Sequence, residues 1–454
     1  MNNQKSVAFV SLGCAKNLVD SEKMLGQLAE AGCAVTNDES DADVIVINTC
    51  GFLDASRREA VEVIREAVGR KKTGRCRRVV VAGCLVQRDG EGLLKHVPGV
   101  DALVGVNNRD DVVRAVLNGD GRNRGRGRPD VFLSDYHPFV QTDQARLRLT
   151  PRHYAYLRIS EGCNQKCTFC TIPSIRGAMH CKPPQVVLNE ARELVDDGAV
   201  EINLIGQDTT SYGEEFANGY GLDRLLRALD GVDGLSWVRL MYVYPSVMTD
   251  AIIDAIATCD RVVKYIDMPL QHINDRVLKA MHRRVTRAET IELLGRLRER
   301  IPGVFIRTTM IVGFPGETDA EFDELVAFVE EFGFDALGTF KYSLEPDTPA
   351  GRMKGQIPAR VKRERYDALM QAQQAVAFQR ADALVGRTLS VLVDGADSDG
   401  AMVGRHAGQA PTVDGVTYVQ GTPRPGEFVT VRCTERRGYD LAGVPTTVPL
   451  SVLA

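Results

Sequence analysis

The sequence has little of what a membrane protein, a fibre or a disordered chain needs. No apolar run in its 454 residues approaches the roughly 18 residues that span a bilayer. Only one tryptophan is present, yet hydrophobic residues make up 44% and charged residues 26%, which is ordinary for globular proteins. The short run Val7–Val10 leads into Gly13-Cys14 without the basic segment of a signal peptide. We therefore interpret it as a first strand and expect a cytoplasmic protein.

The chain also lacks a large excess of either charge and the signatures of several enzyme classes. It has 56 basic and 60 acidic residues, for a formal charge of −4. Proteins that bind nucleic acid backbones are usually basic, so this balance permits RNA binding but does not require it. No P-loop, H-E-x-x-H or Ser-His-Asp arrangement is present, and no G-x-G-x-x-G stands at a strand–helix junction. Nucleotide binding of the Rossmann type is therefore not supported.

The first part of the chain, residues 1–120, alternates strand and helix patterns, which predicts an α/β domain with an open parallel sheet. Its strands are expected at Ser6–Ser11, Val44–Asn48 and Arg78–Ala82, and its helices at Ser21–Ala31 and Asp54–Arg70. Residues 121–148 are expected to form a linker, because the segment Asn118–Pro129 is rich in glycine. The alternative is a basic RNA-binding patch formed by its arginines, Arg122, Arg124, Arg126 and Arg128.

Residues 149–382 repeat the strand–helix pattern, which predicts a partial or complete β/α barrel. The expected strands are Tyr154–Ile159, Glu201–Ile205, Trp237–Tyr242, Val262–Met268, Phe305–Val312 and Phe334–Tyr342. The expected helices between them are Gln185–Asp197, Leu222–Leu229, Asp250–Thr258, Ala288–Arg300 and Asp319–Phe332. Residues 384–454 predict a small antiparallel β-barrel, because short strands are separated by Gly, Pro and Asp turns. Those strands are expected at Thr388–Asp394, Thr417–Gln420, Phe428–Thr434 and Tyr439–Val444.

Cysteine is plentiful, and its number, 11, is odd. A disulfide framework is not expected in such a chain, which favours metal or redox chemistry. The sharpest pattern is Cys163-x3-Cys167-x2-Cys170, the loop cysteines, directly after the first expected barrel strand. Thiolates are natural ligands of iron–sulfur clusters, and three of them leave one iron of a 4Fe-4S cluster open for chemistry. The alternative is a structural zinc site closed by His180 or Cys181.

Three further cysteines share one context, since each follows a predicted strand of the first domain. Cys14 follows "SLG", Cys50 follows "NT" and Cys84 follows "AG". The carboxyl ends of parallel strands lie along one edge, so we expect these edge cysteines to converge and hold a second cluster. The alternative is that they are small buried core residues. Cys33, Cys76, Cys181, Cys259 and Cys433 lack this context and receive no role.

The loop cysteines, with the aromatic Phe169 before the last of them, resemble the cluster motif of radical S-adenosylmethionine (SAM) enzymes. The resemblance implies that SAM binds the open iron and is reductively cleaved to a 5′-deoxyadenosyl radical that abstracts hydrogen. It also implies contacts with SAM from Phe169 and from two turns after barrel strands, which hold Gly206 and Gln207 and then Gly313 and Gly316. From the residues alone, a βα turn with a helix cap at Thr318 is the slightly favoured interpretation of the second turn.

The order of a three-cysteine domain, a radical SAM barrel and a small β-barrel resembling a TRAM domain is similar to the methylthiotransferases. Within this family, the chain most resembles the branch that modifies ribosomal protein uS12. The resemblance lies in the segments Ser11–Glu22, Glu161–Cys163, Pro173–Gly177 and Asp267–His272. The resemblance implies two 4Fe-4S clusters, SAM, methylthiolation of the β-carbon of a uS12 aspartate, and a reductant such as flavodoxin or ferredoxin. Residues 384–454 hold six basic and seven acidic residues, so they suit a basic ribosomal protein at least as well as an RNA backbone; the alternative is a packing module that contacts no partner.

Two alternatives remain: the same chemistry on a tRNA adenosine, and a non-catalytic iron–sulfur protein that binds RNA or the ribosome. Three residues near the expected sites receive no catalytic role. Asn48 and Lys16 flank the edge cysteines and are candidates for tuning a cluster, although a lysine is usually solvated. His272 follows the fourth barrel strand, but hydrogen abstraction needs no general base.

Overall fold

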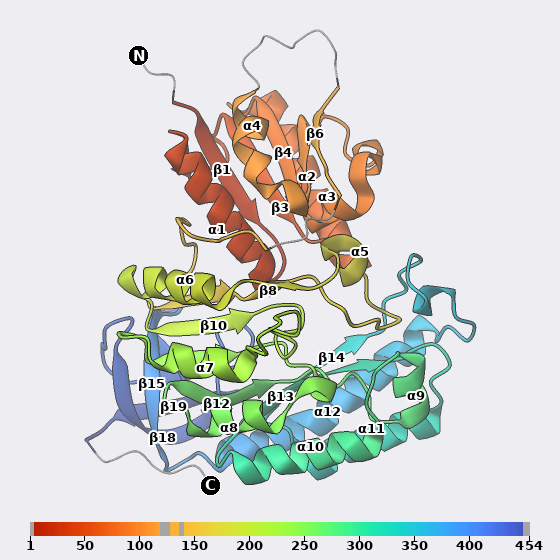
Figure 1. Ribbon diagram of the computed structural model, residues 1–454, viewed down its shortest axis with the longest axis vertical. Coiled ribbons are helices and arrows are strands. Elements are labelled where there is room, and N and C mark those ends of the chain that lie inside the picture. The colour runs from red at the N-terminus through yellow and green to blue at the C-terminus, as the bar shows by residue number, and fades with distance from the viewer. Residues whose placement is uncertain (1–3, 119–127, 136–139, 448–454) are drawn as a thin grey trace.

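The computed structural model describes residues 4–118, 128–135 and 140–447. Figure 1 shows an N-terminal sheet domain above a central β/α body, with a small C-terminal barrel against the lower left of that body. No helix in the described part of the chain is long and apolar enough to cross a membrane. Arg122, Arg124 and Arg126 lie outside the described residues, so the structure does not choose between linker and RNA-binding patch; Arg128 is exposed.

The N-terminal domain is a six-stranded, fully parallel sheet in the order β2-β1-β3-β4-β5-β6. Its strands are β1 Ser6–Ser11, β2 Ala34–Thr36, β3 Val44–Thr49, β4 Arg78–Gly83, β5 Ala102–Val104 and β6 Asp130–Phe132. Its α-helices are α1 Ala15–Glu30, α2 Asp54–Thr73, α3 Cys84–Asp89 and α4 Val112–Leu117. β3 is buried on both faces: Ile45 and Ile47 belong to one apolar cluster with α2, and Val44 and Val46 to another with α1 and α4.

The central body is a second six-stranded parallel sheet, in the order β7-β10-β11-β12-β13-β14. It is open between β7 and β14, so the barrel is partial. Its strands are β7 Tyr154–Arg158, β10 Glu201–Ile205, β11 Trp237–Leu240, β12 Val262–Asp267, β13 Phe305–Val312 and β14 Ala336–Lys341. A short antiparallel pair, β8 Ser160–Glu161 and β9 His180–Cys181, follows β7.

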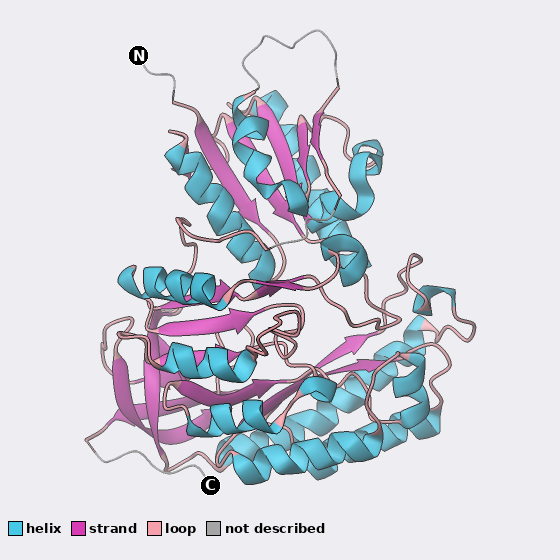
Figure 2. Ribbon diagram, in the orientation of Figure 1, coloured by secondary structure: helices cyan, strands magenta, loops and turns pink. Residues whose placement is uncertain are grey.

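Helices cover the outside of this sheet (Figure 2). The helices of this body are α6 Pro184–Asp196, α7 Leu222–Asp230, α8 Asp250–Thr258, α9 Asp275–Ala280, α10 Arg287–Arg300, α11 Asp319–Phe332 and α12 Ala359–Asp382. The short α5 Ile172–Arg176 lies instead at the boundary with the N-terminal domain, against α3 (Figure 1). Single 3₁₀ turns or short 3₁₀ helices occur at Gly90–Lys95, Val106–Asp111, Pro245–Val247 and Ala350–Arg352. Thr318 caps α11 through a capping box with Glu321, as its position predicts.

The C-terminal barrel is closed and has five strands, in the order β15-β16-β17-β19-β18. They are β15 Thr388–Ala396, β16 Met402–His406, β17 Thr417–Val419, β18 Phe428–Arg437 and β19 Asp440–Pro445. The prediction of a purely antiparallel barrel is wrong in one respect, since β17 and β19 pair in parallel. Five strands cannot alternate direction all the way around a closed ring, so one parallel pair is required.

A buried ion network fixes the C-terminal barrel to the amino-terminal end of the central sheet. Arg405 of β16 donates to Glu201 of β10 over 2.6 Å and to Asp394 over 2.8 Å. Arg239 of β11 donates to the other Glu201 oxygen over 2.9 Å and to the backbone oxygen of Ala407. Charges buried this deeply persist only when they are paired. The carboxyl end of the central sheet is thereby left for the N-terminal domain.

Candidate functional site

The strand ends of the N-terminal sheet bring the edge cysteines together. Cys14 follows β1, Cys50 follows β3, and Cys84 begins α3 directly after β4. Since these strands are adjacent and parallel, their carboxyl ends meet at one edge. Figure 2 shows the arrowheads of these strands pointing down toward the central body. The structure therefore places the three cysteines along one edge, as their sequence context predicts.

The edge cysteines are close enough to affect one another's charge. Burial raises the pKa of Cys50, and Cys14 adds to the rise. Burial raises the pKa of Cys84 to about 12; Arg176 opposes this rise, and Cys14 and Cys50 add to it. At Gly13 a Cβ would lie 2.8 Å from the Cβ of Cys50, so only glycine, here with φ +98°, allows this approach.

Two asparagines hold this edge in place. The side-chain amide of Asn17 donates to the backbone oxygens of Leu12 and Thr49 over 3.0 and 2.8 Å. Asn48 donates to the backbone oxygen of Asn17 and to the hydroxyl of Ser21. These bonds tie α1 to the ends of β1 and β3. These contacts of Asn48 are thus structural, and a cluster-tuning role for it stays a prediction.

The loop cysteines lie on a segment that is pinned to the central body from both sides. The backbone N–H of Thr168 donates to Met281 over 3.0 Å, and its hydroxyl donates to Ala280 over 2.9 Å. Its carbonyl accepts from Ala350 over 2.9 Å. Gly162, with φ +80°, stands where a Cβ would collide with the backbone oxygen of Ala178. The loop can therefore keep its shape independently of any bound group.

The thiols of the loop cysteines also interact with one another. Burial raises the pKa values of Cys163 and Cys170 to about 12 each, and Cys167 adds to both rises. Arg283 lies 3.7 Å from the Cys167 sulfur, and its guanidinium stacks 4.0 Å over the ring of Tyr244. Metal binding removes the thiol proton outright, so these buried thiols suit metal ligation better than free thiolate chemistry.

The loop cysteines and the edge cysteines each form a trio of mutually interacting thiols. Each trio fits an iron–sulfur cluster in which one iron has no ligand from the protein. In the described residues, no three Cys, His, Asp or Glu side chains converge as ligands of one metal ion. A four-iron cluster spreads its thiolates over separate irons, so its ligands do not need such convergence. The fourth ligands of the zinc alternative are engaged elsewhere: His180 bonds Glu215 over 2.9 Å, and the Cys181 sulfur accepts from Gly213 over 3.3 Å.

The first turn predicted to contact SAM lies next to the loop cysteines. At Gly206 a Cβ would lie 2.5 Å from the hydroxyl of Ser160, so the turn packs directly on β8. Gln207 donates to Glu161 over 2.6 Å, and its own side-chain oxygen is buried without a hydrogen-bond partner among the described residues. Such an orphaned acceptor fits a site that receives a ligand with N–H or O–H donors. The contact itself stays a prediction.

The second turn is closed by its own chain. The N–H of Gly313 donates to both carboxylate oxygens of Glu317 over 3.0 Å, and the N–H of Gly316 donates to Gly355 over 2.8 Å. Both glycines have positive φ, which their turn requires. Phe169 packs against an apolar cluster that contains Phe314. The βα-turn alternative is therefore observed, and contact of these residues with SAM stays a prediction.

Arg176 connects the two trios, although in the sequence it stands out only as part of a family motif. Its guanidinium donates to the Cys84 sulfur over 3.1 Å and to Asn17 over 2.8 Å. It also donates to Glu161, two residues before Cys163, over 3.0 Å. Glu161 in turn accepts from Gln207 of the first turn. One buried cation thus links an edge cysteine to the neighbourhood of the loop cysteines.

Further ion pairs close the interface between the two domains. Asp20 of α1 pairs with Arg158 over 2.7 Å and with Arg176 over 3.0 Å. Burial opposes ionisation of Asp20, but Arg158, Arg176 and Arg109 outweigh it and lower the pKa of that carboxyl. Arg158 also pairs with Asp143 over 2.5 Å. These charged residues could not be found from the sequence, because nothing local marks them as buried partners.

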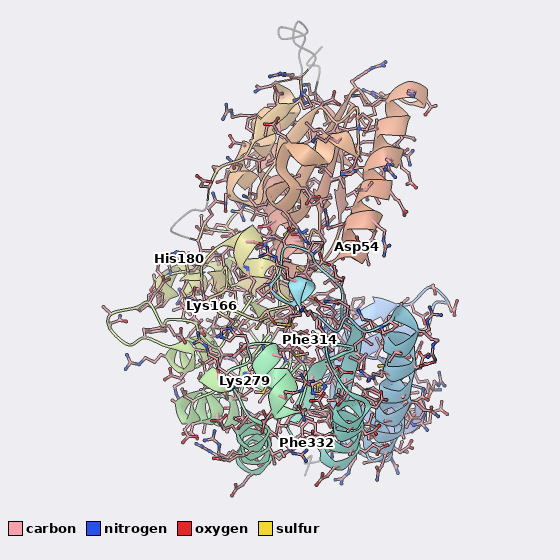
Figure 3. The ribbon with its side chains drawn as sticks, turned by 90° about the vertical axis from the view of Figure 1, so that its right-hand side faces the viewer. Asp54, Lys166, His180, Lys279, Phe314 and Phe332 are labelled. Atoms are coloured by element: carbon pink, nitrogen blue, oxygen red, sulfur yellow. The ribbon has the colours of Figure 1, made fainter. Side chains whose placement is uncertain are left out.

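The opposite side of the interface is joined by Glu345. Its carboxylate accepts from the backbone N–H of Asp54 over 3.0 Å and from Arg88 over 2.7 Å. Thr171, next to Cys170, donates to the backbone oxygen of Phe52 over 3.3 Å. Figure 3 shows Asp54 at the lower end of the N-terminal domain and Lys166 in the upper part of the central body. The two trios therefore lie on elements that face each other across the interface between the N-terminal domain and the central body.

Lys16 differs from what the sequence suggests, whereas His272, which receives no catalytic role from the sequence, does not. Lys16 is not solvated but 7% exposed, with its ammonium 2.9 Å from the centroid of the Tyr242 ring. His272 is fully buried, and burial lowers its pKa to about 4. It is therefore neutral at physiological pH; its Nδ1 accepts from the backbone N–H of Asn274 over 3.0 Å, and its Nε2 lies 3.7 Å from the carboxylate of Glu317.

The family models and the relatives that match this chain point to the same family. Residues 157–329 match the Radical SAM superfamily, residues 385–445 the TRAM domain and residues 6–105 the uncharacterized protein family UPF0004. The chain is 46% identical to the ribosomal protein uS12 methylthiotransferase RimO of Anaeromyxobacter sp. (strain K), covering 95% of this chain and 92% of the relative. RimO of Geotalea uraniireducens is 45% identical, with 97% and 98% covered. This chain belongs to the RimO family.

As a RimO family member the protein is a radical SAM methylthiotransferase with iron–sulfur and SAM cofactors. Solved structures support the fold alone. The methyltransferase TsrM of Kitasatospora setae, with cobalamin and a 4Fe-4S cluster bound, has a TM-score of 0.56 at 16% identity, covering 85% of this chain and 80% of TsrM. The radical enzyme OxsB has a TM-score of 0.52 at 14% identity, covering 82% and 56%. Both likenesses extend well beyond a single domain of this chain.

Proposed function

We propose that the protein methylthiolates the β-carbon of an aspartate in ribosomal protein uS12, the substrate named for its RimO relatives. The observation that carries the proposal is the pairing of two cysteine trios on facing elements, with Arg176 between them. Sulfur insertion into a C–H bond needs a radical generator and a sulfur-carrying centre close together. An iron–sulfur protein without turnover has no need of that proximity.

Residue roles follow from this placement. The loop cysteines would hold the cluster that binds SAM, and the edge cysteines, Cys14, Cys50 and Cys84, would hold the second cluster. When bound, the two clusters and SAM would supply hydrogen abstraction, sulfur and a methyl group. The chain itself orients these groups: Thr168 fixes the loop, Gln207 is positioned by Glu161, and Arg176 neutralises charge beside Cys84. Phe169, Gly206, Gln207, Gly313 and Gly316 are the proposed SAM contacts.

The proposed domain limits are residues 1–120, 121–148, 149–382 and 384–454, for the auxiliary-cluster domain, the linker, the radical SAM barrel and the TRAM-like barrel. The matched ranges 6–105, 157–329 and 385–445 fall inside the three domains. We further propose flavodoxin or ferredoxin as the electron donor, because reductive SAM cleavage needs a low-potential reductant. Nucleic acid is not required, and the proposed compartment is the cytoplasm, where ribosomes are modified.

The test is a competition between uS12 and bulk tRNA. The anaerobically reconstituted enzyme receives both substrates, SAM and a strong reductant, and each substrate is examined by mass spectrometry. A methylthio group on a uS12 aspartate supports the proposal. A methylthio group on tRNA alone would keep the chemistry and overturn the substrate, and 5′-deoxyadenosine without any adduct would overturn the methylthiolation.

A further inference from the structure

Lys16 is a buried cation whose acidic neighbours, Cys14, Asp267 and Glu161, act on its charge without forming an ion pair with it. It is the second residue of α1, and its side chain points onto the ring of Tyr242, 2.9 Å from the centroid. Within the described part of the chain, its ammonium makes no hydrogen bond and no ion pair within 4.0 Å. Lys182, which is fully buried, donates to both Asp143 and Glu190 over 2.7 and 2.6 Å. A buried cation without such a partner is costly, so a retained one points to an anion that arrives from outside.

The ring beneath the ammonium is held rigidly. Tyr242 follows β11 with φ +59°, a left-handed conformation that is rare for an aromatic residue. Its carbonyl accepts from Thr209 over 3.0 Å, and its N–H donates to Asp267 over 3.1 Å. Asp267 cannot readily turn to Lys16, because it pairs with Arg307 over 2.7 Å. The left-handed backbone thus fixes an aromatic ring under one side of the ammonium, and no carboxylate of the described residues lies within 4.0 Å of its other sides.

The position of this cation matches the chemistry of the proposed reaction. Lys16 lies two residues after Cys14, and its neighbours Ala15 and Leu18 pack in one apolar cluster with Tyr156 and Tyr242 of the central body. The ammonium therefore stands between the edge cysteines and the carboxyl ends of the central strands. The carboxyl group of an aspartate is bonded directly to its β-carbon. An ammonium that holds the carboxylate therefore fixes the β-carbon one bond away.

We propose that Lys16 binds the side-chain carboxylate of the target aspartate and makes the enzyme specific for aspartate over its amide. This inference rests on the proposed function, since it presumes an aspartate substrate. The low-dielectric surroundings strengthen the ion pair, and the ring of Tyr242 restricts where the ammonium can go. Hydrogen bonds to charged groups of this kind are worth roughly 1.5–3 kcal/mol, which corresponds to about 10- to 100-fold in binding.

The test is a double-mutant cycle between enzyme and substrate. The reconstituted holoenzyme and its Lys16→Met variant are each titrated with fluorescent uS12 that carries the target aspartate or asparagine in its place. With the natural enzyme the asparagine form binds about 10- to 100-fold more weakly, and with Lys16→Met the two forms bind within about 2-fold. A Lys72→Met variant, at an exposed position of α2, keeps the full discrimination.

Two results would overturn the inference: an unchanged preference for aspartate in Lys16→Met, or no preference in the natural enzyme. A structural role for Lys16 predicts a lower melting temperature for Lys16→Met, whereas removal of an unpaired buried charge does not. The variant's KM for uS12 rises, and its iron content stays that of the natural enzyme. If the natural enzyme places no methylthio group on uS12 at all, the proposed function fails, an outcome distinct from failure at Lys16 alone.

Discussion

The guanidinium of Arg176 lies 3.1 Å from the sulfur of Cys84 and 3.0 Å from the carboxylate of Glu161. Cys84 belongs to the N-terminal domain, and Glu161 begins the segment that carries the loop cysteines. A single buried side chain therefore touches the surroundings of both proposed clusters. Hydrogen bonds to ligand sulfurs raise the reduction potential of iron–sulfur clusters, so Arg176 is a positioning and tuning residue rather than a catalytic one.

Replacement of Arg176 is expected to change the second cluster selectively. Arg176→Met removes the hydrogen bond to Cys84, so the midpoint potential of the cluster on the edge cysteines falls while that of the SAM-binding cluster stays. Redox titration followed by electron paramagnetic resonance measures both. Arg176→Lys retains the charge and recovers part of the potential. Equal potentials in all three proteins would show that Arg176 only holds the domains together.

Single cysteine replacements in the two trios are expected to separate two functions. Cys167→Ala loses SAM cleavage and about half of the bound iron, because each trio is proposed to hold one of two equal clusters. Cys84→Ala loses a similar share of iron but still releases 5′-deoxyadenosine. Iron analysis and chromatography of the nucleoside products measure both. Cys433→Ala, at a buried position in the C-terminal barrel, serves as the control and keeps both activities.

A methyl group at Gly162 is expected to disturb the loop cysteines. Gly162→Ala would strain a residue with φ +80° and place its Cβ against the backbone of Ala178. We expect iron at the loop cysteines to fall sharply while the cluster on the edge cysteines remains. Gly69→Ala, in the helix α2 where a Cβ meets nothing within 4 Å, is the matched control and stabilises by up to about 1 kcal/mol. Full iron in Gly162→Ala would show that the loop tolerates a different shape.

The Arg405–Glu201 pair is expected to hold the C-terminal barrel on the central body. Arg405→Met leaves the buried carboxylate of Glu201 and the part-buried carboxylate of Asp394 with fewer partners, which costs roughly 3–5 kcal/mol. Chemical denaturation measures the loss. Arg360→Met removes an exposed pair with Glu364 and changes stability by less than about 1 kcal/mol. A similar small effect for both variants would contradict the proposed anchoring.

Two buried histidines predict how stability depends on pH. Burial lowers the pKa of His272 to about 4 and that of His406 to about 3. Below about pH 6.5 both histidines bind protons in the unfolded chain but stay neutral in the folded chain. The free energy of unfolding is therefore highest above about pH 6.5 and falls as the pH drops below that value. Each histidine contributes about 1.4 kcal/mol per pH unit between pH 6 and pH 5. His272→Gln and His406→Gln should each flatten the curve; an unchanged slope would contradict the burial of a neutral ring.

Much of the fold follows from local sequence patterns. The strands β1, β10 and β13 begin and end where their β-branched runs predict, and the edge cysteines meet because their strands are parallel neighbours. The start of α1 was predicted six residues late. Its first turns carry polar residues that are nonetheless buried, such as Asn17 and Asp20, so no apolar period marks them as helical.

The site was less predictable than the fold. Cysteine spacing identified the proposed cluster ligands, but the burial of Lys16 and the contacts of Arg176 depend on which domain packs against which. The strand β16 was missed because Met402–His406 contains glycine, arginine and histidine and shows no clear alternation. Its Arg405 is buried only because Glu201 lies opposite on another domain. Partners that are far apart in sequence leave no local signal.

The measurement that tests the account most directly follows a single hydrogen atom. The enzyme is reconstituted anaerobically and given uS12 whose aspartates carry deuterium at the β-carbon, and the released 5′-deoxyadenosine is analysed by mass spectrometry. The account predicts deuterium in 5′-deoxyadenosine in an amount that matches the methylthiolated uS12. Unlabelled 5′-deoxyadenosine alone, whether or not uS12 gains sulfur, would contradict abstraction from an aspartate β-carbon.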